Sequence, residues 1–248
     1  MTDTVVRDQS RLATARAFLF DLDGVLTPTV DVHMRAWGRL FRSYLDEVGA
    51  EPYTDDDYYL YIDGKPRVDG VRSLLESRGL SLPTGEADDA PGDTTVWALG
   101  NRKNEAFAAE LAENGVAPYP GSLDFVTAVI AAGYEVAVVS SSRNAVSVLS
   151  AAGIRDRFEV IVDGMVAVEA GLPGKPAPDT YVYAATLLGL TPEDCVVVED
   201  AHSGVQAGRD GDFGLVVGVD RGVGAQGLLD SGADIVVQDL DELIPALR

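Results

Sequence analysis

The sequence predicts an α/β fold: a doubly wound, Rossmann-like parallel sheet core with an inserted all-helical cap domain. Two observations predict this class. After Pro118, short apolar runs alternate with stretches of helical pattern, which is typical of βαβ units and a parallel sheet. An earlier apolar run at 17–20 is separated from them by a long segment of mostly helical pattern, which indicates an insert after the first strand.

The elements before Pro118 follow from their composition and periodicity. Residues 1–15 are polar and are expected to form a loose tail, and the run Ala-Phe-Leu-Phe at 17–20 predicts a buried strand. Apolar residues at helical spacing predict three helices in the insert, at 33–48, around 71–75 and over 101–114. A Pro-, Gly- and acid-rich stretch at 81–93 is expected to be a loop.

The second half of the chain supplies the other strands. Compact apolar runs predict them at 136–139, 160–162, 196–198, 215–217 and 235–237. Helical patterns lie between several of these runs, including one at 179–188. We therefore expect a discontinuous core domain (16–30 and 118–248) and a helical cap domain (31–117).

Composition excludes several classes of function. The 248 residues include 19 Lys plus Arg and 40 Asp plus Glu, a net charge of −21, which argues against nucleic acid or an anionic membrane as partner. No apolar run approaches the length needed to span a bilayer. Cys195 is the single cysteine, so no internal disulfide can form, and we expect it to be a small buried filler. These features favour a cytoplasmic protein, which we expect to be a monomer.

Polar residues follow the predicted strands at the edge where doubly wound sheets bind ligands. Asp21 and Asp23 follow the first strand, Ser140 the second, and Glu199-Asp200 a later one. Crowded carboxylates need a cation, and oxygen ligands select a hard one, most simply Mg²⁺. Lys175, between Gly174 and Pro176, is the candidate cation that would share the charge of an anionic substrate.

These residues resemble the four ordered motifs of the haloacid dehalogenase (HAD) superfamily, and they span most of the chain in the same order. The motif residues are Asp21-Leu22-Asp23-Gly24-Val25, Ser140, Lys175 and Glu199-Asp200. The second Asp of the first motif is typical of the phosphotransferases of that superfamily rather than of its dehalogenases. The helical insert resembles the cap of the β-phosphoglucomutase-like branch.

The resemblance implies a role for each motif residue. Asp21 would attack the phosphoryl group to form an aspartyl-phosphate, and Asp23 would act as the general acid and base. Ser140 and Lys175 would hold the equatorial phosphate oxygens. The Mg²⁺ ligands would be the side chains of Asp21, Glu199 and Asp200 and the backbone carbonyl of Asp23.

The resemblance also implies substrate-binding residues in both domains. In the cap they are His33, Gly64, Arg67, Lys103 and Asn104, of which Arg67 and Lys103 would grip a second phosphate. In the phosphate loop of the core they are Ser141, Ser142, Arg143 and Asn144, with Arg143 where a Lys is common. Pro28 departs from the family pattern, which has Asp there, and this departure concerns the hinge rather than the phosphoryl chemistry.

Three functions compete at this stage. A mutase that interconverts β-glucose 1-phosphate and glucose 6-phosphate is favoured. Such an enzyme needs cations distant from the nucleophile, and Arg67 and Lys103 would supply them. A phosphatase of small sugar phosphates and a binding module without turnover are the alternatives. A GxGxxG pattern at 222–227 is not interpreted as a dinucleotide site, because too little chain follows it for the required βαβ unit and acid.

Overall fold

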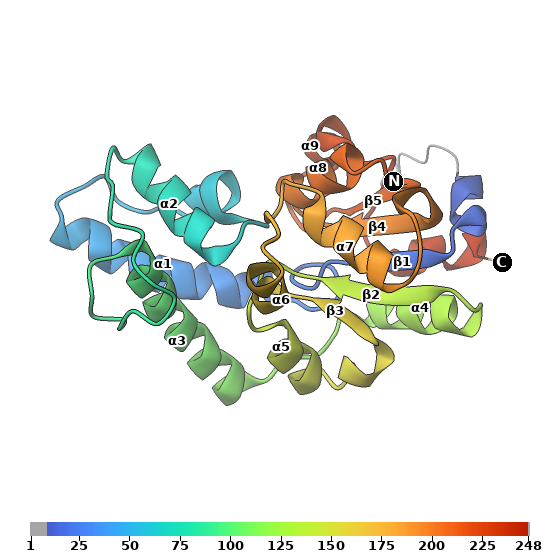
Figure 1. The fold of residues 1–248 in the computed structure, drawn as a ribbon, viewed down its shortest axis with the longest axis horizontal. Coiled ribbons are helices and arrows are strands. Elements are labelled where there is room, and N and C mark those ends of the chain that lie inside the picture. Colours follow the sequence, from blue (N-terminus) through green and yellow to red (C-terminus); the bar gives the residue numbers. More distant parts are fainter. Residues whose placement is uncertain (1–8, 248) are drawn as a thin grey trace. The chain divides into compact units, whose positions relative to one another are not determined.

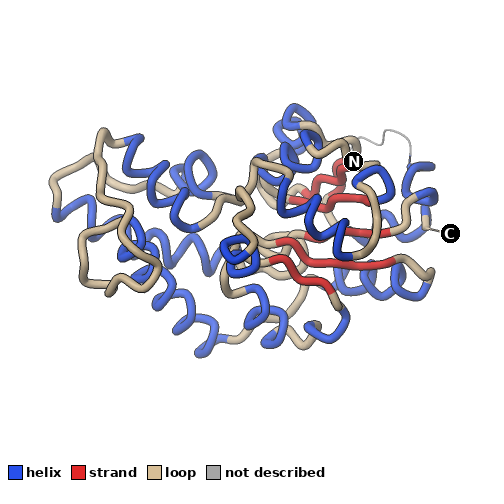
Figure 2. Tube along the Cα trace, in the orientation of Figure 1, coloured by secondary structure: helices blue, strands red, loops and turns tan. Residues whose placement is uncertain are grey.

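The structure is a computed structural model that describes residues 9–247 (Figures 1 and 2). The chain divides into two compact units, one made of Met1–Pro28 with Val116–Arg248 and the other of Thr29–Gly115. Of the expected N-terminal tail, residues 1–8 lie outside the described residues. Gln9–Thr14 form a short 3-10 helix, in which Leu12 is fully buried.

The first unit is built on a parallel sheet of six strands in the order β3-β2-β1-β4-β5-β6. The strands are β1 (Ala17–Phe20), β2 (Glu135–Val139), β3 (Val160–Val162), β4 (Cys195–Glu199), β5 (Leu215–Val219) and β6 (Ile235–Val237). The predicted doubly wound parallel sheet is confirmed. Because β1 lies between β2 and β4, the strand order reverses at β1, and the carboxyl ends of these three strands meet at the switch point where such sheets bind ligands.

Helices cover both faces of this sheet, as Figure 1 shows for α7 and α4. α7 (Asp179–Leu187), α8 (His202–Asp210) and α9 (Ala225–Ser231) share one apolar cluster with Leu19. α4 (Pro120–Ala131) packs on the other face, where the Phe125 ring meets Phe18 edge-on at 5.3 Å between centroids. Successive side chains of a strand alternate between faces, so the four residues of β1 are buried on both.

The second unit is helical and has its own core. Its α-helices are α1 (Val30–Glu47), α2 (Arg67–Ser77) and α3 (Val96–Asn114), and a π-helical turn lies at Tyr58–Ile62. Trp37, Phe41, Leu74 and Leu99 belong to one buried cluster. The predicted helices are present, and no sequence pattern predicted the π-helical turn.

Local hydrogen bonds explain where the structure departs from the predicted element boundaries. α3 begins before the predicted residue 101, because the Thr95 hydroxyl accepts a hydrogen bond from the Ala98 amide and caps the helix there. A short helix, α6 (Gly164–Glu169), was not predicted, and it is capped by the Asp163 carboxylate through the amides of Met165 and Val166. Within 9–247, none of the helices combines the length and the apolar character that crossing a bilayer requires.

Candidate active site

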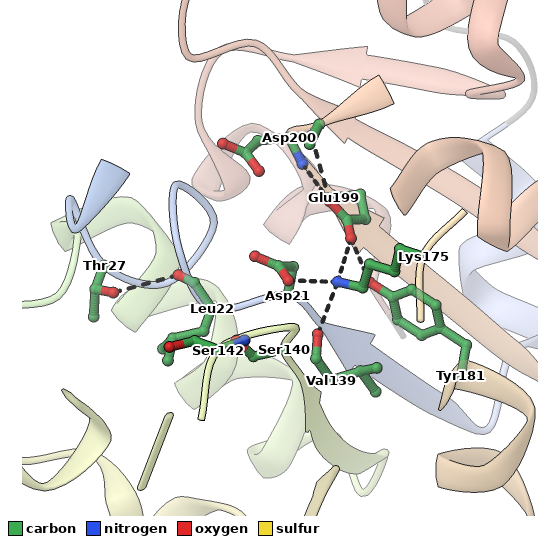
Figure 3. A network of polar contacts seen from close by, with 11 residues as sticks. Asp21, Leu22, Thr27, Val139, Ser140, Ser142, Lys175, Tyr181, Glu199 and Asp200 are labelled. Atoms are coloured by element: carbon green, nitrogen blue, oxygen red, sulfur yellow. Dashed lines mark hydrogen bonds and ion pairs between the residues drawn. The ribbon is translucent and has the colours of Figure 1, made fainter. Parts of the chain in front are cut away.

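β1 and β4 are neighbours, and their register brings the predicted carboxylates together. Phe20 pairs with Val198, and the Asp21 amide donates to the Val198 carbonyl at 2.9 Å, so Asp21 leaves the sheet beside Glu199 and Asp200. These three acids are buried, and each offers a carboxylate oxygen within 4.8 Å of the others. Figure 3 shows them around one point at the carboxyl edge of the sheet.

Lys175 lies at the centre of this cluster. Its ammonium donates to Asp21 Oδ1 at 2.5 Å, to Glu199 Oε1 at 2.6 Å and to the Val139 carbonyl at 3.0 Å. The side chain is 1% exposed. Burial by itself lowers the pKa of an ammonium, but the carboxylates of Asp21 and Glu199 outweigh it, and the pKa of Lys175 is raised. Lys175 therefore stays charged at any physiological pH.

Glu199 is held on both carboxylate oxygens by the protein. Oε1 accepts from Lys175 and from the Tyr181 hydroxyl at 2.8 Å, and Oε2 accepts from the Asp200 and Ala201 amides at 3.1 and 3.3 Å. Tyr181 is fully buried, with the Lys175 ammonium 4.9 Å from its ring centroid. Sequence reasoning missed Tyr181, because a tyrosine in the first turns of an amphipathic helix is indistinguishable from a core residue.

A glycine makes room for this arrangement. A Cβ on Gly204 of α8 would lie 1.8 Å from Glu199 Oε1, so any larger residue would displace the carboxylate. No pattern in the sequence singled out Gly204, because the contact joins α8 to β4 in three dimensions.

The carboxyl of Asp21 has a strongly perturbed pKa. Burial raises its pKa well above the ordinary value; Lys175 opposes this shift, and the negative charges of Glu199 and Asp23 add to it. Three buried carboxylates with one ammonium leave an excess of negative charge. The site is therefore suited to a further cation, and its all-oxygen donor set fits a hard divalent ion such as Mg²⁺.

Asp23 lies on the loop that continues from β1. It is half-buried and bridges to Thr27, and the Gly24 amide donates to the Thr27 carbonyl at 2.8 Å. Gly24 has φ of +86°, a left-handed conformation that favours glycine. This tight turn begins directly after β1, and it keeps Asp23 at the same edge of the sheet as Asp21.

The predicted phosphate loop follows β2. Ser140 is buried, and its hydroxyl oxygen accepts from the Ser142 amide at 3.1 Å. The Ser142 hydroxyl oxygen in turn accepts from the Asn144 amide at 3.2 Å, at the start of α5 (Ala145–Ala151). Gly164 of α6 supports the loop, because a Cβ there would come within 2.8 Å of the Ser141 carbonyl.

Of the remaining predicted residues of the phosphate loop, Arg143 turns towards α6. Its Nε lies 2.8 Å from the Met165 sulfur. Ser140 therefore lies directly after β2, Arg143 contacts α6, and Asn144 is the residue before α5.

The predicted cap residues all lie in the helical unit. The Lys103 ammonium donates to His33 Nδ1 at 2.5 Å, and both residues are buried. Lys103 also lies over the rings of Trp37 and Phe107, at 5.1 and 4.8 Å from their centroids. α1 and α3 are thus joined by a buried ammonium–imidazole pair.

Of the other cap residues, Arg67 packs against the amino-terminal half of α3, and Asn104 lies on that helix. Arg67 Nη1 donates to the Gly100 carbonyl at 3.3 Å, and the absence of a side chain at Gly100 lets the Arg67 chain pack against α3. Gly64 has φ of +69°, which turns the loop before α2. Within this unit the first residue of α2 therefore contacts α3 at Gly100, about one turn before Lys103 and Asn104.

The GxGxxG pattern has a structural explanation. Asp220 Oδ1 accepts from the amides of Gly222 and Gly224, both at 3.0 Å. These hydrogen bonds lower the pKa of Asp220, against the opposite effect of burial. The amides that would cradle a pyrophosphate are already occupied by a carboxylate, which agrees with the rejection of a dinucleotide site.

Comparisons with known proteins identify the family. The model of the haloacid dehalogenase-like hydrolases matches residues 15–212. A β-phosphoglucomutase of Mycobacterium tuberculosis is 48% identical over 92% of this chain and 91% of its own. Hexitol phosphatase A of Escherichia coli is 31% identical over 78% of each chain. The crystal structure of a Clostridium difficile β-phosphoglucomutase has a TM-score of 0.74 and 26% identity, covering 92% of this chain and 93% of that one.

The chain has an α/β fold with a buried carboxylate–lysine cluster at the sheet's switch point, and its relatives place it in the class of α/β enzymes. The chain belongs to the haloacid dehalogenase-like hydrolase family. It is an enzyme of that family, so the resemblance read from its motifs is confirmed.

Proposed function

We propose that the protein is a Mg²⁺-dependent phosphoryl transferase that interconverts β-glucose 1-phosphate and glucose 6-phosphate. The observation that carries the proposal is the buried Lys175, which joins Asp21 and Glu199 at the ends of β1 and β4. The relative from M. tuberculosis, called a β-phosphoglucomutase and 48% identical over most of both chains, supports the mutase activity.

Each step of the reaction can be assigned to residues of this chain. Asp21 attacks phosphorus and forms an acyl phosphate, while the bond from phosphorus to the sugar oxygen breaks. Asp23 gives its proton to that oxygen and later removes the proton of the incoming hydroxyl, which attacks phosphorus as the bond from phosphorus to Asp21 breaks and the carboxylate is regenerated. Lys175 and Ser140 hold the phosphoryl oxygens in place, and position and charge are the main sources of catalysis in such transfers.

Asp21, Glu199 and Asp200, with the Asp23 carbonyl, would hold Mg²⁺. Bound there, the ion would neutralise carboxylate charge and polarise the phosphoryl oxygens. The Lys175 ammonium also offsets the charge of Asp21, through the 2.5 Å contact. Substrate binding would exchange part of that contact for phosphate oxygens, which leaves Asp21 more nucleophilic.

A mutase passes through a sugar bisphosphate, and one of its two phosphates lies away from the reacting centre. The helical unit would bind that second phosphate, through Arg67, Lys103 and Asn104. The support for this grouping is the hydrogen bond from Arg67 to the Gly100 carbonyl, on the helix that carries Lys103 and Asn104. Because His33 holds the Lys103 ammonium at 2.5 Å, Lys103 would act on a phosphate only by sharing or exchanging that partner. The small substrate and the acidic chain agree with a cytoplasmic enzyme without nucleic-acid or membrane partners, and we expect it to act as a monomer.

A phosphatase of small sugar phosphates is the second candidate, favoured by the 31% identity to hexitol phosphatase A. The product from β-glucose 1-phosphate with a bisphosphate primer decides between them. We expect glucose 6-phosphate, and stoichiometric inorganic phosphate without it would establish the hydrolase instead.

The aspartyl-phosphate step has its own test. Asp21→Asn is expected to lower turnover by about a thousandfold or more. Asp210→Asn, on the exposed end of α8, is the matched control and should leave turnover unchanged. Wild-type turnover in Asp21→Asn would contradict the mechanism.

A further inference from the structure

The loop that carries Asp23 is held at three consecutive peptide carbonyls by donors from outside it. The pairs, donor first, are Arg221 Nε with Gly24 (3.1 Å), Ser122 Oγ with Val25 (2.6 Å) and the Tyr119 amide with Leu26 (3.0 Å). Three successive peptide planes are thereby fixed relative to α4 and to the loop after β5. The Gly24 carbonyl is the nearest of them to Asp23.

Arg221 is the donor with the widest reach. Besides Gly24, its Nη1 donates to the Gln238 carbonyl at 2.9 Å and its Nη2 to Asp239 Oδ1 at 3.0 Å. Its guanidinium carbon lies 3.9 Å from the centroid of the Tyr119 ring. The side chain is 18% exposed. All three guanidinium nitrogens are engaged, which a planar, rigid fork allows and a lysine does not.

The segment that presents Arg221 is itself rigid. Asp220 accepts from the amides of Gly222 and Gly224, and its own amide donates to the Val237 carbonyl at 2.8 Å. Arg221 therefore projects from a closed turn at the carboxyl end of β5. The sequence of this glycine-rich turn resembles a nucleotide-binding motif, but the turn places the Arg221 guanidinium against the loop that carries Asp23.

We propose that Arg221 is a positioning residue for Asp23. It contacts the loop at the Gly24 carbonyl, in the peptide between Gly24 and Val25, one residue after Asp23. The inference rests on the proposed function, in which Asp23 moves the proton of the leaving oxygen. Proton transfer depends steeply on placement, so a loop that shifts by a fraction of an ångström slows the step without changing substrate affinity.

Arg221→Lys tests the proposal, because it keeps the charge and loses the fork. Arg209→Lys is the matched control: Arg209 is half-exposed and pairs with Asp210. With β-glucose 1-phosphate we expect Arg221→Lys to lower kcat about tenfold and to leave KM within about twofold. With p-nitrophenyl phosphate, whose leaving group is a weak base and needs no proton, the burst of p-nitrophenolate should be unchanged.

A second readout does not depend on substrate. Amide hydrogen exchange of the peptide covering 21–27 should become about tenfold faster in Arg221→Lys, while Arg209→Lys leaves it unchanged. Ser122→Ala removes the donor to the Val25 carbonyl. It should likewise lower kcat with β-glucose 1-phosphate and speed exchange over 21–27. It supplies the test if Arg221→Lys does not fold.

The outcomes separate this proposal from the proposed function. Unchanged exchange over 21–27 would overturn the inference whatever the activity, and so would a lowered Tm with wild-type kcat. An equal loss on both substrates would also overturn it, since Arg221 would then act on more than the proton. If the wild-type protein turns over neither substrate, the proposed function fails, and the exchange experiment still decides whether Arg221 holds the loop.

Discussion

Replacing Lys175 by Met tests the electrostatics of the site directly. The change keeps an unbranched chain of similar length and removes the only ammonium among the contacts of Asp21 and Glu199 within the described residues. Both carboxylates are almost completely buried, so they lose their partner in a place where water cannot replace it. Removing one partner of a buried ion pair costs about 3–5 kcal/mol, and we expect a loss of that size in the free energy of unfolding at pH 8.

The loss should shrink as the pH falls. Burial raises the folded pKa of Asp21, so the folded state takes up a proton that the unfolded state, with a pKa of about 3.9, releases. Stability therefore decreases as pH rises between these two values and returns on acidification. In Lys175→Met the attraction of the ammonium is gone, so the free energy of unfolding decreases more steeply with rising pH than in the wild-type protein. Urea unfolding at pH 8 and pH 5.5 measures it.

The two units call for separate probes. Trp37 and Trp97 both lie in Thr29–Gly115, so tryptophan fluorescence reports the helical unit, whereas circular dichroism reports the whole chain. We expect the loss in the dichroism transition alone. Lys65→Met is the control, because the half-buried Lys65 contacts only a neutral partner, Ser73, in the hydrogen bonds described. A loss below about 1 kcal/mol in Lys175→Met, or one independent of pH, would refute the reasoning.

Three further outcomes are expected. Tyr181→Phe should lower kcat about fivefold at unchanged KM in a steady-state assay, because Glu199 loses one of its donors. Burial raises the pKa of the Cys195 thiol to about 12, so iodoacetamide at pH 8 should label it only after denaturation, as mass spectrometry would show. Asp57→Asn should destabilise the helical unit by about 3 kcal/mol at pH 7, because the buried guanidinium of Arg78 loses its charged partner; tryptophan fluorescence during urea unfolding measures this.

Each of these has a contradicting result. Tyr183→Phe, on the same helix, is the control for Tyr181, and equal effects would show that helix packing is responsible. Rapid labelling of native Cys195 would contradict its burial. For Asp57, burial raises the carboxyl pKa but the Thr54 amide and Arg78 outweigh it, so the pKa is lowered. Its stabilisation should therefore vanish as pH falls below about 4 in the wild-type protein, and a pH-independent difference from the variant would be inconsistent.

Most of the fold could be predicted, because strands buried on both faces are continuous apolar runs. β1 and β4 are fully buried along their length, and each stands out in the sequence between polar residues. The start of α3 could not be placed, since it depends on one hydroxyl, that of Thr95, among several polar residues in a loop. The π-helical turn has no periodicity that a sequence pattern detects.

The site was predictable where a motif continues a strand. Asp21 follows β1 directly and Glu199 is the last residue of β4, so knowledge of a parallel sheet is enough to bring them together. Tyr181 and Arg221 were missed for another reason. Their contacts join elements distant in sequence, and neither residue type marks a function until its partner is known.

The position of β1 has a consequence for how the protein can fold during synthesis. Ala17 of this central strand pairs with Glu135 on one side and Cys195 on the other, across the whole helical unit. The helical unit has all its residues in one continuous segment and can collapse as it emerges. The sheet cannot close until β4 has left the ribosome, so β1 waits as an apolar segment without its neighbours. Topologies with such distant pairings fold slowly, and the unpaired apolar first strand is exposed to aggregation until its neighbours arrive.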